Sequence, residues 1–491
     1  MENLLIEGAT GKWEIVIGLE VHAQVTSKSK LFSRAPTDFG GKPNDHVSFV
    51  DAGMPGMLPV INKTCVDQAI KTGIGFHGTV NKFSAFDRKN YFYPDLPNGY
   101  QISQLYYPII SDGHIDIEDE DKNIKRIRVE RLHLENDAGK SIHDMDPKKT
   151  LVDLNRAGVA LMEIVSHPDM RSPLQAQNYV KKLRTLLRYL GTCDGNMDEG
   201  SLRVDANISL RRPGAELGTR TEIKNVNSIR FLGQALEYEI TRHQMVLESG
   251  EKIVQETRLF DPTSGKTRSM RSKEDAMDYR YFPDPDLPPL RLSDERIESI
   301  RKSMVELPDE KANRFVSEMG LSKYDASILT AERETADFYE KIISKNTHSD
   351  KTFPKLASNW LIGEVFAAMK RDDKTIKTLP ITSQNIADLV ILIQKGIISS
   401  KIAKDVFLNM WESGKDPSSL VKELGLEQVS DTGEIESQID EIMKNNDKLV
   451  TDYRNGKEKT FGFFVGQVMK AMKGKANPSI VNELLKKKLK G

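Results

Sequence analysis

Polar and apolar residues alternate along residues 13–25, near the start of the chain. Odd positions from Trp13 to Val25 are all apolar, whereas the even positions include Glu14, Gly18, Glu20, His22 and Gln24. A period of two predicts a β-strand with one face in a core and the other carrying polar groups. Because Glu20 and His22 project side by side, they are suited to share a divalent metal or a phosphate-bearing substrate. An amphipathic strand with a wet outer face is the simpler explanation of this run alone.

Further segments repeat this pattern of polar side chains on one strand face. One carries Arg131, His133 and Glu135, a second carries Ser201, Arg203, Asp205, Asn207 and Ser209, and the segment 222–227 includes Lys224. Residues 161–165 hold one carboxylate, Glu163, in an otherwise apolar strand. Burying an ionised carboxylate without a partner costs several kcal/mol, so Glu163 requires a nearby cation. Either a metal ion or a buried arginine meets that requirement.

Several such strands together predict a sheet with a functional polar face. Carboxylates with one histidine form a hard, oxygen-rich site that suits Mg²⁺ or Mn²⁺. Arg203 and Lys224 are placed to neutralise phosphate oxygens during a transfer reaction. A water-exposed sheet face with incidental ion pairs is the alternative.

The chain changes character near residue 290. Up to there, short alternating runs predict a sheet-rich region interrupted by two amphipathic helices, one from Ser172 to Gly191 and one from near Ser228 to before Gly250. The proline-rich segment 281–289 breaks regular structure and marks a boundary. From Asp294 onward the pattern is helical almost throughout. The sequence therefore predicts an α+β protein.

Composition limits the class of protein. The chain has 491 residues and a net charge of −1, so we expect two to four domains and, at most, a local surface for nucleic acid. Only Cys65 and Cys193 are present, which argues against a disulfide scaffold or a cysteine zinc site. No apolar run approaches the roughly 20 residues of a membrane span, and the acidic start is unlike a presequence. We expect a cytoplasmic protein with no membrane partner.

Two segments combine features suited to RNA or nucleotides. Residues 86–103 interleave aromatic residues with Arg88 and Lys89, which suits base stacking and phosphate binding, although such loops often only pack. Near the end of the chain, basic residues form either a binding surface or a solvated helix face: Lys470, Lys473, Lys475 and Lys486 to Lys488.

These motifs resemble a known family. Residues 18–22, 86–103, 133–140, 199–207 and 278–283, together with Val465–Met469 and Asn477–Pro478, look like the B subunit of the aspartyl/glutamyl-tRNA(Asn/Gln) amidotransferase. The resemblance covers essentially the whole chain. It implies an N-terminal cradle domain similar to glutamine synthetase and guanidino kinases (1–293), a helical domain (294–410) and a tRNA-binding helical tail (411–491).

The resemblance also implies a reaction. ATP phosphorylates the side-chain carboxylate of Glu-tRNA(Gln), or of Asp-tRNA(Asn), and ammonia then displaces the phosphate to give the amide. Ammonia comes from the glutaminase A subunit of a heterotrimer that also contains a small C subunit. This agrees with the residues, since neither cysteine has a nearby histidine that would make it a glutaminase nucleophile.

Residue by residue, the resemblance implies a Mg²⁺ cluster of Glu20, His22, Glu135 and Glu163. The predicted catalytic residues are Glu20, His22, Glu163, Arg203, Asp205 and Lys224, the last three contacting phosphate or the ammonia path. Arg88, Lys89 and Arg203 are predicted to contact ATP.

The chain departs from the family pattern at two places. Asn136 stands where many relatives carry a second glutamate, which puts a ligand role for that position in doubt. Many relatives also bind zinc through two cysteine pairs, whereas the aligned residues here are Ser33, Ala35, Ser48 and Asp51. We therefore predict no zinc site.

Two other functions remain open from the sequence. One is an ATP-dependent enzyme acting on a free carboxylic acid, for which the basic helical tail has no evident use. The other is a non-catalytic tRNA-binding scaffold. Such a scaffold would have no evident need for the single carboxylate, Glu163, in an otherwise apolar strand.

Overall fold

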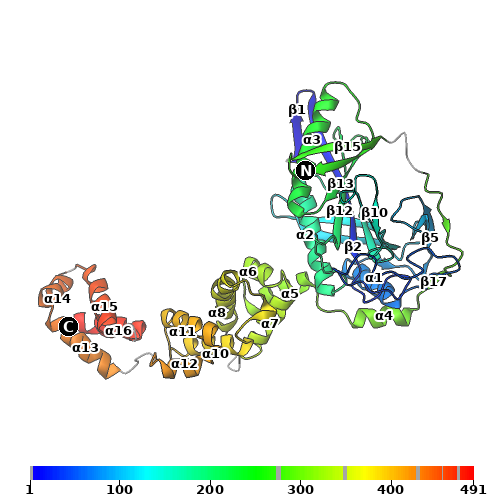
Figure 1. Ribbon diagram of the computed structural model, residues 1–491. Helices are drawn as coiled ribbons and strands as arrows, with labels where there is room; N and C mark the ends of the chain where they lie inside the picture. Colours follow the sequence, from blue (N-terminus) through cyan, green and yellow to red (C-terminus); the bar gives the residue numbers. More distant parts are fainter. Residues whose placement is uncertain are drawn as a thin grey trace. The chain divides into compact units, whose positions relative to one another are not determined.

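A computed structural model describes residues 4–272, 278–346, 351–426, 432–455, 457–472 and 476–490. These residues form two compact units, one ending at Pro308 and the other beginning at Asp309. The first unit is rich in strands and the second is helical (Figure 1), which confirms the α+β prediction. Within the described residues, no helix has the length and apolar character needed to cross a membrane.

A ten-stranded sheet is the centre of the first unit. Its order is β15-β14-β13-β12-β2-β11-β8-β7-β3, with β1 paired to β2. Neighbouring strands are antiparallel except β13 and β14, which are parallel. The strands are β1 (Leu5–Gly8), β2 (Gly11–Gln24), β3 (Thr79–Val80), β7 (Ile110–Glu118), β8 (Ile124–Asn136), β11 (Ala160–Ser166), β12 (Leu202–Arg211), β13 (Thr221–Val226), β14 (Glu256–Asp261) and β15 (Lys266–Ser272).

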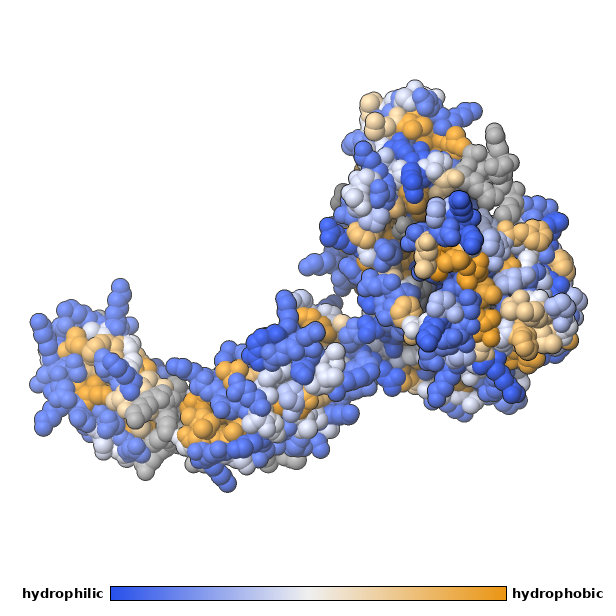
Figure 2. Space-filling view, in the orientation of Figure 1, coloured by the Kyte–Doolittle hydropathy of each residue, from blue (hydrophilic) through white to orange (hydrophobic). Residues whose placement is uncertain are grey.

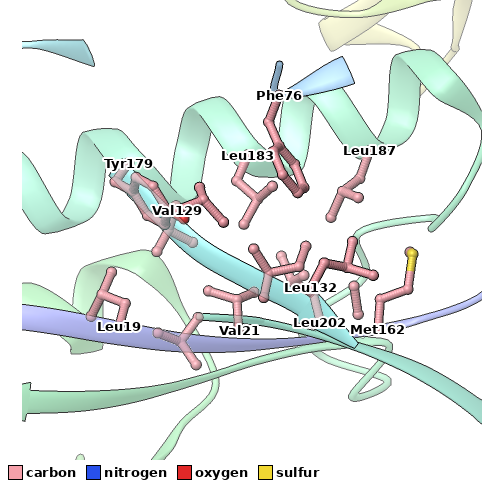
Figure 3. Packing of buried hydrophobic residues seen from close by; sticks show 14 of the residues in the cluster. Leu19, Val21, Phe76, Val129, Leu132, Met162, Tyr179, Leu183, Leu187 and Leu202 are labelled. Carbon is pink, nitrogen blue, oxygen red and sulfur yellow. The ribbon is translucent and has the colours of Figure 1, made fainter. Parts of the chain in front are cut away.

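Helices cover one face of this sheet. Side chains of α2 (Pro173–Leu190), such as Leu183, pack onto side chains of β2, β8, β11 and β12, such as Val21 of β2 (Figure 3). The same core includes α1 (Lys63–Gly75) and α3 (Ile229–Glu248). Each large apolar side chain buried there contributes about 1.5–3 kcal/mol. The opposite face of β2 is left for polar side chains, as the alternation predicts.

The two helices predicted in this region have the expected ends. The Ser172 side chain accepts a hydrogen bond from the Gln175 backbone N–H, and Gly191 ends α2 in a left-handed conformation with φ 69°. Ser228 caps α3 in the same way. A glycine fits the end of α2 because a side chain would be strained at that φ.

Smaller sheets stand beside the main one. Three short strands pair as β16-β5-β6, namely β5 (Asp87–Asn90), β6 (Tyr100–Ser103) and β16 (Phe282–Pro283). Two further pairs are β9 (Lys140–Ile142) with β10 (Leu151–Asp153) and β4 (Phe83–Ser84) with β17 (Leu290–Arg291). Gln101 of β6 donates a 2.8 Å hydrogen bond to the backbone carbonyl of Asn136, so the small sheet is anchored at the end of β8.

The first unit extends beyond the proline-rich segment. It includes α4 (Asp294–Lys302), because Arg296 forms a 2.6 Å ion pair with Asp67 of α1. The predicted boundary at residue 293 falls just before α4, and the three-part division of the chain stays a prediction.

The regular elements described in the second unit are helices. Those up to residue 423 are α5 (Pro308–Met319), α6 (Lys323–Leu329), α7 (Arg333–Ile343), α8 (Phe353–Trp360), a π-helix (Leu361–Val365), α9 (Phe366–Arg371), a 3₁₀ turn (Ile376–Thr378), α10 (Ser383–Gln394), α11 (Ser400–Ser413) and α12 (Pro417–Glu423). The remaining four share a separate apolar core: α13 (Thr432–Lys444), α14 (Asp447–Arg454), α15 (Thr460–Ala471) and α16 (Pro478–Lys490).

A buried lysine holds the long loop between β2 and α1. Lys30 is fully buried, and its Nζ lies 3.1 Å from Asp51 Oδ2. The same carboxylate accepts hydrogen bonds from the Ser33 hydroxyl at 3.1 Å and the Ser48 backbone N–H at 2.9 Å. Three of the four positions considered for zinc are therefore joined at the Asp51 carboxylate, which also pairs with the Lys30 ammonium. The absence of zinc stays a prediction.

A second buried ionic network joins α3 to the sheet edge. Glu239 is fully buried and accepts hydrogen bonds from Arg242 and from the Thr267 hydroxyl of β15, while Arg258 of β14 lies 3.1 Å away. Burial alone would raise the pKa of Glu239, but its hydrogen bonds from His243, Arg242 and Thr267 lower it to about 2. The ionised carboxylate therefore stabilises the contact between α3, β14 and β15.

We expect Glu239→Gln to destabilise this edge by about 3 kcal/mol at pH 7, because it leaves buried cations without their counter-charge. The pKa is lowered on folding, so the ionised form stabilises the protein above the unfolded pKa near 4.5 and loses this effect as the pH falls toward about 2. Hydrogen exchange should show that the variant loses protection of the backbone amides in α3, β14 and β15. This loss should be full at pH 7 and smaller at pH 4. The control is Glu237→Gln, on the exposed side of the same helix, which should keep wild-type protection at both pH values. An equal loss of protection at pH 7 and pH 4 in Glu239→Gln would contradict the prediction.

Candidate active site

The sheet register brings the predicted polar residues into adjoining rows. His133 of β8, Glu163 of β11, His22 of β2 and Arg203 of β12 face one another directly across four neighbouring strands. In the next row, Glu20 lies opposite both Val165 and Asp205. Residues that are far apart in the sequence therefore share one face because their strands are neighbours in the sheet.

Three of the four predicted metal ligands form a compact cluster. One ligand atom each from His22, Glu135 and Glu163 lies within 4.8 Å of the others. His22 Nε2 is 3.2 Å from Glu163 Oε2 and 3.7 Å from Glu135 Oε1. The Ser103 hydroxyl of β6 donates a 3.3 Å hydrogen bond to Glu135, which fixes that carboxylate from the neighbouring small sheet.

His133 completes this cluster and was not among the predicted site residues. Its Nε2 lies 3.5 Å from both Glu135 Oε2 and Glu163 Oε2, and the side chain is buried. Its Nδ1 is buried and has no hydrogen-bond partner within the described structure. The alternation of His133 with Glu135 matches that of Glu20 with His22, so the sequence did contain the signal.

The histidines and Glu163 shift one another's protonation. Burial favours the neutral imidazole, but the Glu163 carboxylate beside it raises the pKa of His133 to about 9. The pKa of His22 is also raised, against burial, by the hydrogen bond and charge of Glu163. Burial would raise the pKa of Glu163, yet the two imidazoles hold it well below its usual range. Within the described structure, the groups next to the Glu163 carboxylate are therefore the imidazoles of His22 and His133, and a metal bound here would take His22 in its neutral form.

This donor set fits a hard divalent cation. Two carboxylates and an imidazole nitrogen converge from three neighbouring strands, and they are nearly enclosed. Mg²⁺ and Mn²⁺ bind through such oxygen-rich sets and keep waters or substrate phosphates in the remaining positions. When bound by His22, Glu135 and Glu163, the metal would neutralise charge on phosphate oxygens.

Glu20 lies beside the cluster but is not one of its three members. Its Oε1 accepts a 2.9 Å hydrogen bond from the Asn207 side chain. Burial and the nearby carboxylates of Glu163, Glu222 and Asp205 raise the pKa of Glu20. A cation bound near Glu20 would relieve this repulsion, so its ligand role stays a prediction.

The predicted cations have carboxylate partners. Arg203 Nη2 lies 3.0 Å from Asp137 Oδ2, while its Nε is buried without a hydrogen-bond partner in the described residues. Lys224 Nζ lies 3.2 Å from both Asp205 Oδ2 and Glu222 Oε1. Asp137 and Glu222 were not among the predicted site residues, and their part in holding these cations depends on long-range pairing.

The two basic residues of β5 have different surroundings. Arg88 forms ion pairs of 2.9 and 2.8 Å with Asp284 and Asp286 and lies 4.2 Å from the centre of the Tyr100 ring. Lys89 lies 4.9 Å from the centre of the Tyr279 ring, and against the effect of burial the Glu135 charge raises its pKa. Lys89 is thus electrostatically linked to the cluster, and contact of either residue with ATP stays a prediction.

The Asn136 side chain is engaged in a hydrogen bond to the backbone, which disfavours a ligand role for it. Its Oδ1 accepts a 2.6 Å hydrogen bond from the backbone N–H of Ile102 in β6.

The basic residues predicted in the tail are described only in part. Lys488 forms a 2.6 Å ion pair with Asp440, and Lys470 lies on α15. Lys473 and Lys475 lie outside the described residues.

The structure defines a protein with a sheet-rich first unit, which carries a candidate metal site, and a helical second unit, and comparisons with known proteins identify its family. Residues 15–298 match the family described as the GatB/GatE catalytic domain, and residues 337–489 match that described as the GatB domain. The chain is 56% identical over 484 residues to the aspartyl/glutamyl-tRNA(Asn/Gln) amidotransferase B subunit of Granulibacter bethesdensis, covering 99% of both chains. Proteins of the same name from Zymomonas mobilis and Rickettsia conorii are 55% and 56% identical, over 100% and 99% of both chains.

The chain belongs to the family of aspartyl/glutamyl-tRNA(Asn/Gln) amidotransferase B subunits. This confirms the resemblance found from the motifs and the prediction of an amidotransferase component in protein biosynthesis.

Proposed function

We propose that this chain is the ATP- and Mg²⁺-dependent subunit that converts Glu-tRNA(Gln) to Gln-tRNA(Gln), Asp-tRNA(Asn) to Asn-tRNA(Asn), or both. The observation that carries the proposal is the His22, Glu135 and Glu163 cluster on the same sheet face as Arg203 and Lys224. Phosphoryl transfer needs positioning and neutralisation of phosphate charge more than it needs covalent help from the protein. A largely antiparallel sheet with metal ligands, as in glutamine synthetase and guanidino kinases, meets that need.

The reaction has two balanced steps. In the first, an oxygen of the substrate side-chain carboxylate forms a bond to the terminal phosphorus of ATP, the bond to the bridging oxygen breaks, and ADP leaves. In the second, ammonia attacks the carbonyl carbon of the acyl phosphate; inorganic phosphate leaves and the nitrogen loses a proton, giving the amide. Arg203 and Lys224 would stabilise phosphate charge, and the nearly enclosed cluster limits loss of the acyl phosphate to water.

Ammonia must reach this site from another protein of the complex. Both cysteines of the chain are buried, and burial raises the pKa of Cys65 to about 11 and that of Cys193 to about 12. Thiols held in that state are poor nucleophiles at neutral pH. We therefore assign glutamine hydrolysis to the A subunit of a heterotrimer with the small C subunit.

The surface of the first unit supports such an assembly. Figure 2 shows apolar residues gathered in patches on one of its faces. The loop between β2 and α1 exposes Phe39, Phe49, Leu58 and Val60, with exposed fractions from 61% to 76%. Apolar groups concentrated in one loop are typical of a protein interface. We assign tRNA binding to the basic tail, 411–491, and expect the complex to work in the cytoplasm.

The experiment that tests this function is ADP release by the chain assembled with its amidase and C subunits, with ammonium present throughout. We expect release to rise at least tenfold with Glu-tRNA(Gln) or Asp-tRNA(Asn) and not with uncharged tRNA. Stimulation by free glutamate would favour the small-acid enzyme instead. Binding of charged tRNA without any ADP release would favour the scaffold.

A further inference from the structure

A hollow of about 780 Å³ lies near the start of β2, at a distance from the candidate active site. Glu14 lines it and precedes Glu20 by six residues on the same strand, which is about 20 Å at the rise of a β-strand. The hollow shares no described lining residue with the His22, Glu135 and Glu163 cluster. Among its described lining residues are two carboxylates and five cations, and the cations are Lys125, Arg126, Arg128, Arg171 and Arg211.

Two of these cations are neutralised within the protein. Arg126 donates two 2.9 Å hydrogen bonds to the Asp116 carboxylate. Arg128 donates to both oxygens of Asp169, at 2.9 and 2.8 Å. Each of these guanidiniums has a carboxylate of its own, so any excess of positive charge in the hollow comes from the other three cations.

Two of the remaining cations share one carboxylate. Arg171 Nε lies 2.7 Å from one oxygen of Glu14, and Arg211 Nε lies 2.6 Å from the other. The two arginine side chains are only 21% and 20% exposed. Their Nη1 groups donate to backbone carbonyls, whereas across the described ranges neither Nη2 group donates a hydrogen bond. Two guanidiniums on one carboxylate therefore keep donors for a second anion.

Lys125 adds a third positive charge that, among the described residues, forms no ion pair. Its Nζ donates a 2.7 Å hydrogen bond to Gln175 Oε1, and the Gln175 amide donates in turn to Glu120, which does not line the hollow. Burial lowers the pKa of Lys125, and the charge of Arg171 lowers it further, with a larger effect than any single nearby carboxylate. The hollow therefore keeps a positive potential that attracts anions.

The size and shape of the hollow favour a small ligand that carries phosphate. Its volume lies within the range that accommodates small organic molecules. A planar guanidinium matches phosphate oxygens with two parallel hydrogen bonds, and two guanidiniums meet here at Glu14. Leu4, Leu5 and Pro213 also line the hollow and offer apolar contact to an organic part of the ligand.

We propose that this hollow binds a small phosphate-bearing molecule, whose oxygens accept hydrogen bonds from Arg171 and Arg211 beside the Lys125 ammonium. The site goes beyond the proposed function, because no step of amide formation takes place there. The backbone of RNA offers the same phosphate chemistry, but it needs a row of cations along its length. We assign the hollow to a free molecule because the unmatched charge gathers around a single carboxylate, Glu14, while Arg126 and Arg128 are neutralised.

The test is calorimetric titration of the full chain with pyrophosphate, without Mg²⁺ or ATP. We expect saturable binding by the wild type. Arg211→Gln should raise the Kd at least about tenfold, because a hydrogen bond to a charged group is lost, and Lys125→Met should raise it about three- to tenfold. Glu14 keeps Arg171 as a partner in both variants, so the end of the sheet should stay folded. The matched control is Arg212→Gln, which removes a positive charge at the next residue, one that does not line the hollow.

Wild-type affinity for pyrophosphate in both Arg211→Gln and Lys125→Met would overturn the proposal, as would a wild-type chain that shows no saturable binding. An equal rise in Kd for Arg212→Gln would overturn it too, because net charge alone would then explain the effect. In a parallel titration with uncharged tRNA, Arg211→Gln should bind as the wild type does. A matching loss of tRNA affinity would assign the hollow to RNA instead. These measurements involve neither charged tRNA nor ATP, so they do not depend on the proposed function.

Discussion

Glu163→Gln should lower Mg²⁺ affinity at least about 100-fold and slow ADP release with charged tRNA about 1000-fold. Loss of an outer-shell partner of a metal ligand typically costs about 10–100-fold in affinity, and Glu163 would be a direct ligand. Its Oε2 lies 3.2 Å from His22 and 3.5 Å from His133, so it stands at the centre of the cluster. A metal that stabilises transition-state charge by about 4 kcal/mol accounts for a rate effect of that size.

The measurements are calorimetric titration with Mg²⁺ and ADP release by the assembled complex. Glutamine preserves the size of the side chain, so circular dichroism of the variant should match that of the wild type. Glu118→Gln, an exposed carboxylate at the end of β7, is the control and should change neither quantity. A Mg²⁺ isotherm like that of the wild type in Glu163→Gln would remove this residue from the metal site.

Local signals in the sequence predicted much of the fold. The alternation from Trp13 to Val25 identified β2, and a serine cap with a terminal glycine identified α2 from Ser172 to Gly191. These features depend on residues within one element, whose backbone geometry fixes which side chains share a face. The same reasoning placed Glu20, His22 and Glu163 on strand faces before their neighbours were known.

The arrangement of the strands could not be predicted in the same way. β11 lies between β2 and β8, which puts Glu163 between His22 and His133. Strand order is decided by pairing between distant segments, and alternation does not reveal it. For the same reason the sequence did not show that Asp137 holds Arg203, or that Lys30 is buried against Asp51. His133 is a different case, since the alternation places it on the same strand face as Glu135, although it was not among the predicted site residues.

Lys224→Met should lower kcat for charged tRNA about 100-fold while leaving Mg²⁺ affinity within twofold of the wild type. Lys224 Nζ lies 3.2 Å from Asp205 and from Glu222, and the charges of these two carboxylates raise its pKa against the effect of burial, so the ammonium stays protonated. Removing one preorganised charge from a transition state typically costs about 100- to 1000-fold. Mg²⁺ affinity should hold because Lys224 is not part of the His22, Glu135 and Glu163 cluster.

The control for this prediction is Lys224→Arg, which keeps the charge but changes its geometry and should recover at least a tenth of wild-type kcat. Both variants remove the amine from between Asp205 and Glu222, so a purely structural role would affect stability in both and kcat in neither. Wild-type kcat in Lys224→Met would show that the lysine only balances those carboxylates. A parallel loss of Mg²⁺ affinity would show instead that Lys224 shapes the metal site and does not contact the transferred phosphate.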